Sequence, residues 1–131
     1  MSRIVKQLLA ASLALTLFLS GTAMGAAMYP TTLGLNASRT SIHKGQKVVF
    51  SGKLQAPFAK CKKFSTVTLY RNGDAVKSRT TSETGHYSFT RKPSETRTWQ
   101  VKFGGKSGGV HPNQWVCKSS HSEKIQVTVT S

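Results

Sequence analysis

Acidic residues are scarce in this sequence. Four carboxylates stand against 19 lysines and arginines, which gives a formal net charge of +15 at pH 7. A hydrolase needs a nucleophile with a base and an orienting group, or two carboxylates flanking a cleft. The acids are set apart among polar and turn residues: Asp74, Glu83, Glu95 and Glu123. A Ser-His-Asp triad would have to use Asp74, which follows an Asn-Gly turn and is more simply solvated. We therefore predict no catalytic residue and no enzyme.

Metal-ligand spacings and phosphate-binding loops are also missing. The histidines are too scattered for a recognised zinc spacing: His43, His86, His111 and His121. His111 and His121 could approach Cys117 across a loop, but a bridged Cys117 would cost a zinc site its best ligand. The run Gly-Gly-Lys-Ser at 104–107 lacks the earlier glycine of a phosphate loop, because position 100 is Gln. The sequence predicts neither a metal site nor a cofactor.

Long apolar runs are absent except near the start. Residues 8–19 are mostly apolar, follow the basic residues Arg3 and Lys6, and precede a stretch of small residues. Spanning a membrane requires roughly 20 apolar residues, so a secretory signal peptide fits better than the alternative, a membrane anchor. We predict cleavage after Gly25 or Ala27. The mature protein is then expected to be secreted or cell-wall associated, with no transmembrane segment.

Cysteine is limited to Cys61 and Cys117. In an oxidising compartment the default for two cysteines is a disulfide. A disulfide between positions 61 and 117 would close a long loop, and the chain-entropy estimate gives it about 4 kcal/mol of stability, less any strain. The alternative is a catalytic or metal-binding thiol.

A two-residue hydrophobic alternation dominates the rest of the chain. Tyr87 and Phe89 alternate with polar residues, and Trp99, Val101 and Phe103 do the same after a turn. Such alternation predicts half-buried strands.

The full set of expected strands is 33–37, 47–54, 64–71, 75–81, 86–91, 96–103 and 123–130. Asn72-Gly73 predicts a type I′ hairpin turn, and the strand after it should be short or at an edge.

We predict a loose tail up to Pro30, a long loop over 104–122 and essentially no helix, because no stretch after the signal has a 3.6-residue period. Seven short strands predict an all-β, two-sheet antiparallel sandwich, with a small closed barrel as the competitor. Residues 1–27 would be the signal peptide and residues 28–131 a single domain.

Four segments carry a resemblance to a known family. They are Val-Val-Phe-Ser-Gly at 48–52, Val-Thr-Leu-Tyr-Arg at 67–71, Thr-Gly-His-Tyr-Ser-Phe at 84–89 and Trp-Gln-Val-Lys-Phe-Gly at 99–104. In this order they resemble the bacterial immunoglobulin-like domains of exported proteins, notably those of actinomycetes. The resemblance implies a binding, spacer or adhesion module and carries over no catalytic residue. The two cysteines and the basic surface depart from that family.

One basic constellation remains as a candidate binding patch. In such a sandwich, the loop between the second and third strands lies at the same end as the loop between the last two strands. A Cys61–Cys117 bridge would tie these loops together. The patch comprises Lys60, Lys62, Lys63, Lys106, Trp115 and Lys118. Lysines beside an aromatic ring suit an anionic polymer or surface, such as a wall polymer, an acidic polysaccharide or nucleic acid. The plainer interpretation is that Trp115 covers the disulfide and the lysines are merely solvated.

The sequence thus predicts a secreted, non-catalytic binding or adhesion-type module that contacts an anionic polymer or an envelope surface. Two alternatives remain open: an inhibitor or effector that binds another protein through the same loops, and a carrier that holds a small apolar ligand between the sheets.

Overall fold

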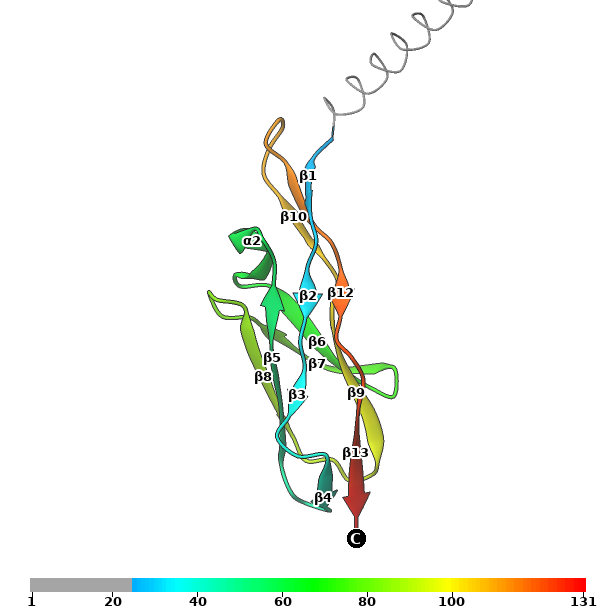
Figure 1. The fold of residues 1–131 in the computed structure, drawn as a ribbon. Helices are drawn as coiled ribbons and strands as arrows, with labels where there is room; N and C mark the ends of the chain where they lie inside the picture. The colour runs from blue at the N-terminus through cyan, green and yellow to red at the C-terminus, as the bar shows by residue number, and fades with distance from the viewer. Residues whose placement is uncertain (1–24) are drawn as a thin grey trace, which may run out of the picture.

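The computed structural model describes residues 25–131, so the predicted signal peptide falls almost wholly outside the described residues. Two sheets face each other, and a third, smaller sheet extends beyond one end of the sandwich (Figure 1). The first sheet contains β4 (Ser41–His43), β13 (Ile125–Thr130), β9 (Arg97–Phe103), β6 (Thr66–Arg71) and β7 (Asp74–Thr80), with β12 (Ser120–His121) also paired to β9. The second contains β2 (Thr32–Leu33), β3 (Asn36–Ala37), β5 (Val48–Gln55) and β8 (His86–Arg91).

The core lies between these two sheets. Along the central strands, buried residues alternate with more exposed ones, as the sequence pattern predicts, and the alternation weakens at Gly52, Arg91 and Arg97, which are only partly buried. Phe50 of the second sheet meets Trp99 of the first with ring centroids 4.8 Å apart, and Val101 and Val127 complete the first sheet's inner face with no exposed surface. The predicted two-sheet sandwich is confirmed.

The Asn-Gly hairpin is also confirmed. Arg71 pairs with Asp74 across the turn, and Asn72 and Gly73 have φ values of 48° and 87°, the positive values that a type I′ turn requires. Strand β7, which follows, is an edge strand as expected, and its seven residues equal the length of the predicted strand 75–81.

The expected loop over 104–122 is wrong. It contains β10 (Lys106–Gly108), β11 (Trp115–Cys117) and β12, and β10 pairs antiparallel with β11. Strands of two or three residues interrupted by glycine and serine are too short to show a two-residue period, so backbone pairing alone reveals them.

The expected tail before Pro30 is wrong for the same reason. Residues Ala27–Tyr29 form β1, which pairs parallel with β11 from Ala27↔Trp115 to Tyr29↔Cys117. The Lys118 amide then donates to the Tyr29 carbonyl at 2.9 Å. Strands β1, β11 and β10 make up the small third sheet.

One short helix also departs from the prediction. Helix α2 (Ala59–Lys62) occupies a single turn between β5 and β6. After it, Phe64 has a positive φ of 49°, and strand β6 therefore begins at Thr66 rather than at residue 64. A single turn is too short to show the 3.6-residue pattern. Within residues 25–131, no helix has the length and apolar character needed to cross a membrane.

Candidate binding surface at the disulfide-tied end

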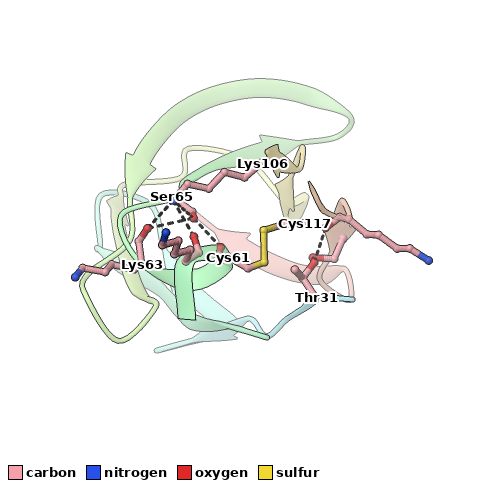
Figure 2. The surroundings of a disulfide bond; sticks show 9 residues. Thr31, Cys61, Lys63, Ser65, Lys106 and Cys117 are labelled. Atoms are coloured by element: carbon pink, nitrogen blue, oxygen red, sulfur yellow. Dashed lines mark hydrogen bonds between the residues drawn. A yellow bond between two sulfur atoms is a disulfide. The ribbon is translucent and has the colours of Figure 1, made fainter. Parts of the chain in front are cut away.

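A disulfide joins α2 to the third sheet. Cys61 and Cys117 are bonded, with their Cα atoms 5.5 Å apart (Figure 2). Both cysteines are almost completely buried. The predicted bridge is confirmed, and it places the loop that contains α2 beside the hairpin of β10 and β11.

The carbonyls at the end of α2 are held by the ammonium of Lys106. Its Nζ donates to the Lys60 carbonyl at 2.9 Å and to the Lys63 carbonyl at 2.8 Å, and it lies 3.3 Å from the Ser65 hydroxyl (Figure 2). A cation at a helix C-terminus satisfies carbonyls that have no partner within the helix. Burial lowers the pKa of Lys106 from its usual value.

Two buried hydroxyls hold the remaining carbonyls of this turn. Ser65 Oγ donates to the Cys61 carbonyl at 2.7 Å, and Thr81 Oγ1 donates to the Lys62 carbonyl at 2.6 Å. Thr81 Oγ1 also accepts from the Ser65 amide at 2.8 Å. An isolated turn of four residues would not be stable in water, so this network and the disulfide fix the position of α2.

Three aromatic rings form a ladder next to α2. Tyr29 stacks on Phe58 at 4.5 Å between centroids, and Phe58 meets Trp115 edge-on at 5.4 Å. Lys60 Nζ lies 5.9 Å from the Trp115 ring centroid, within the range of a cation–π contact. The ring of Trp115 lies against Gly108, its partner on β10, where a Cβ atom would collide with it.

The sequence reasoning missed Tyr29 and Phe58. Tyr29 lies in the predicted tail, and its role depends on a parallel pairing that no local pattern shows. For Phe58 the one available signal was its nearness in sequence to Cys61. Trp115 is half-buried rather than freely exposed, because this ladder covers one side of it.

The structure brings together part of the predicted patch. A shallow hollow of about 220 Å³ is lined by Lys60, Lys63, Phe64, Lys106 and Trp115. Lys63 Nζ also lies 3.6 Å from Glu83 Oε1, with both side chains largely exposed; such surface ion pairs contribute little to stability.

Lys118 and Lys62 lie elsewhere. Lys118 follows β11, which ends at Cys117, and it lines a second hollow that includes Met28, Val116 and Lys106 but not Trp115. Lys62 is half-buried and lies against Gly85, a tight position where any Cβ would come within 3.1 Å of the Lys62 Cβ.

Apolar side chains are also exposed at this end. Met28, Phe64 and Val110 are 59%, 58% and 79% exposed. Met28 comes from β1, Phe64 follows α2, and Val110 lies between β10 and β11. In the part of the chain that the structure describes, no three His, Cys, Asp or Glu side chains are grouped so that they could hold a metal ion.

Two comparisons with known proteins found no relative. No established family profile matches the chain, and no curated protein matches it.

Solved structures do resemble it. One is the solution structure of a CARDB domain from Pyrococcus furiosus, with a TM-score of 0.50 and 13% identity over 79% of this chain and 97% of that one. Another is a crystal structure of the same domain, described as a complex with di-metal ions, with a TM-score of 0.46 and 14% identity over 76% and 91% of the two chains.

The likeness to the solution structure shows the fold. CARDB domains are immunoglobulin-like β-sandwiches, so this chain has an immunoglobulin-like fold. The solution structure comes from an archaeon. It therefore supports the immunoglobulin-like part of the resemblance drawn from the sequence and not its actinomycete part.

Proposed function

We propose that this chain is a secreted, non-catalytic binding module that contacts an anionic polymer or envelope surface through its disulfide-tied end. One observation carries the proposal: Lys60 lies beside Trp115, and Lys63 lines the same hollow. The expected signal peptide supports secretion, and the likeness to bacterial immunoglobulin-like domains of exported proteins favours a wall polymer or acidic polysaccharide.

The surface is suited to such a partner because it is charged and rigid. Lys60 and Lys63 supply positive charge, while the half-buried Trp115 offers a ring face on which a sugar or a base could stack. The disulfide and the Lys106 hydrogen bonds hold α2 in place before a partner arrives. A partner therefore does not have to order this segment, which lowers the entropic cost of binding.

A salt titration tests the electrostatic part. Binding to dextran sulfate should weaken steeply as NaCl is raised, because neutralised charges on a polyanion release counterions, and uncharged dextran should bind far less. The variant K60Q/K63Q should weaken dextran sulfate binding by at least tenfold. The matched variant K77Q/K124Q, which removes two exposed lysines from other parts of the surface, should weaken it much less. Binding that is equal at low and high salt would contradict the proposal.

A protein partner is the second candidate. The exposed side chains of Met28, Phe64 and Val110 at the same end favour it, because they offer apolar area that a protein partner could bury. An inhibitor or effector that binds in this way would lose more affinity from W115A than from K60Q/K63Q, with little dependence on salt. The carrier alternative is not favoured, since Phe50 and Trp99 fill the space between the sheets.

A further inference from the structure

Three arginines occupy inward-facing positions at the other end of the sandwich. Arg71 pairs with Trp99, Arg91 with Val48, and Arg97 with Val127. The pairing partners Trp99, Val48 and Val127 are all buried, with at most 1% of their surface exposed. Directly opposite residues of paired strands project to the same face. The arginines therefore continue the core-facing rows of both sheets, where apolar residues would normally stand.

These arginines line one hollow. Its volume is about 130 Å³, and its walls include Arg71, Arg91 and Arg97, the turn between β8 and β9, and Trp99. Figure 1 shows that this turn lies at the end of the sandwich where β13 finishes, whereas α2, β10 and β1 lie at the opposite end. The hollow is therefore separate from the disulfide-tied surface. It has room for several water molecules or for one tetrahedral oxyanion.

The charges around the hollow are unbalanced. Lys92 joins the three arginines in lining it, and Glu95 is the single acid in its walls. Glu95 forms an ion pair with Arg97. Arg71 and Arg91 form no ion pair with any residue in the described part of the chain. Like charges gathered around a partly enclosed space repel one another, and an anion bound between them would be attracted to each of them and offset this repulsion.

One residue that lines the hollow also has a buried donor without an acceptor. Trp99 is 1% exposed, and its Nε1 is the one buried side-chain polar atom without a hydrogen-bond partner among residues 25–131. Such orphaned donors are uncommon, and they are often explained by a bound ion or water. Arginine presents several N–H groups in a plane and is suited to binding phosphate and related oxyanions.

We propose that this hollow, named here the arginine hollow and formed by Arg71, Arg91, Arg97 and Trp99, binds a tetrahedral oxyanion group: a phosphate or a sulfate. Guanidinium groups from three strands provide more donors than the two oxygens of a carboxylate can use, and the unpaired indole N–H belongs to a residue that lines the same hollow. The same chemistry has two sources, a free ion or an ester group carried on a polymer. The site is independent of the lysine surface proposed above, because it lies at the other end of the molecule.

The Trp99 indole N–H provides a direct measurement. Sodium sulfate or phosphate is titrated into ¹⁵N-labelled protein, with NaCl adjusted to keep the ionic strength constant. We expect the Trp99 Nε1–H resonance to shift downfield in a saturable manner, while the Trp115 resonance changes little. Binding should weaken at least tenfold in R71Q/R91Q. It should be retained in K77Q/R79Q, which removes two positive charges from exposed positions of β7.

Thermal unfolding gives an independent readout. A ligand that binds only the folded protein raises its unfolding temperature, so sulfate at constant ionic strength should raise that of the wild-type protein and of K77Q/R79Q more than that of R71Q/R91Q. The proposal is overturned if the Trp99 resonance does not move, or if R71Q/R91Q responds to sulfate as the wild-type protein does.

The source of the group is decided with short dextran sulfate chains. If dextran sulfate binds more tightly per sulfate group than free sulfate does, and causes the same Trp99 shift, the ligand is an ester group on a polymer. If only the free ions shift the Trp99 resonance, the ligand is a free ion. Either result supports the oxyanion site. Testing K60Q/K63Q in the same titration separates the two proposals, because loss of the lysine surface should leave the Trp99 response intact.

Discussion

The ammonium of Lys106 donates to the carbonyl of Lys60 at 2.9 Å, although the two residues are 46 positions apart in the sequence. One lysine of the predicted patch therefore holds another in place. Lys106 contributes to the surface mainly by fixing α2, and Lys60 is left to extend toward Trp115.

Replacing Lys106 should destabilise the fold. K106Q removes the charged donor from two carbonyls, and hydrogen bonds to charged groups contribute about 1.5–3 kcal/mol each when well formed. Because this ammonium is partly exposed, we expect a total loss of about 1–2 kcal/mol in the free energy of unfolding, measured by urea denaturation. K118Q is the matched control, since Lys118 is an exposed lysine that follows β11. Equal stability of the two variants would contradict the capping role of Lys106.

Removing the disulfide should cost more. The bridge spans 56 positions, and the chain-entropy estimate for a loop of that length is about 4 kcal/mol. We expect the free energy of unfolding of C61S/C117S, measured by urea denaturation, to be lower than that of the wild-type protein by a few kcal/mol, in line with this estimate. Reductant should lower the unfolding midpoint of the wild-type protein and leave that of the variant unchanged. A measurement of intact mass should show that the oxidised protein is lighter than the reduced protein by two hydrogens. If reductant leaves the unfolding midpoint of the wild-type protein unchanged, the disulfide does not contribute this stability.

Alkaline pH should destabilise the protein through Tyr87. Its side chain is 5% exposed and donates to the Gly34 carbonyl, and burial raises the pKa of Tyr87 well above its usual value of 10.0. The folded protein keeps this proton where the unfolded chain loses it. The stabilisation is therefore complete below about pH 10 and declines as the pH rises further, by up to about 1.4 kcal/mol for each pH unit.

Tyr87→Phe should remove this pH dependence. Y87F should lose about 1 kcal/mol at neutral pH, since the Gly34 carbonyl loses its donor. Above about pH 10 its free energy of unfolding should fall less steeply than that of the wild-type protein. Urea denaturation at several alkaline pH values measures both slopes. Y70F alters a half-buried tyrosine and should keep the wild-type slope; identical slopes for wild type and Y87F would contradict the assignment.

Ser122 should be sensitive to loss of its hydroxyl. Its side chain is buried, accepts from the Val101 amide at 2.9 Å and donates to the Glu123 carbonyl at 2.8 Å. This bond joins β9 to the chain between β12 and β13, where the pairing register shifts by one residue. S122A leaves a buried amide unpaired, so we expect a loss of about 1–3 kcal/mol. S119A changes an exposed neighbouring serine, and its stability in thermal or urea unfolding should be close to that of the wild-type protein. Wild-type stability of S122A would refute the role of the Ser122 hydroxyl.

The central strands could be predicted because their burial has a local signature. Trp99, Val101 and Phe103 alternate with polar residues, and all three are buried. Asn72-Gly73 specified its own turn because its backbone preference is intrinsic to those two residues. Strands β1, β10 and β11 had no such signature, since each has three residues, and the partner of β1 is distant in the sequence.

The candidate binding patch could likewise be predicted only in part from the sequence. Its two loops were correctly expected to meet, because strand order determines which loops share an end of a sandwich. The direction of each side chain could not be predicted from strand order. Lys118 follows directly after β11, a strand that the sequence did not reveal, and lines a hollow that does not include Trp115.

By itself, the sequence determined the alternating strands, the tight hairpin and the pairing of two lone cysteines, because these depend on local periodicity, backbone preference and redox chemistry. Tertiary structure alone decided that Lys106 holds α2, that Tyr29, Phe58 and Trp115 form a ladder, and that three arginines meet beside Trp99. These contacts join residues from separate strands and loops, and their geometry is fixed only when the sheets pair and face each other.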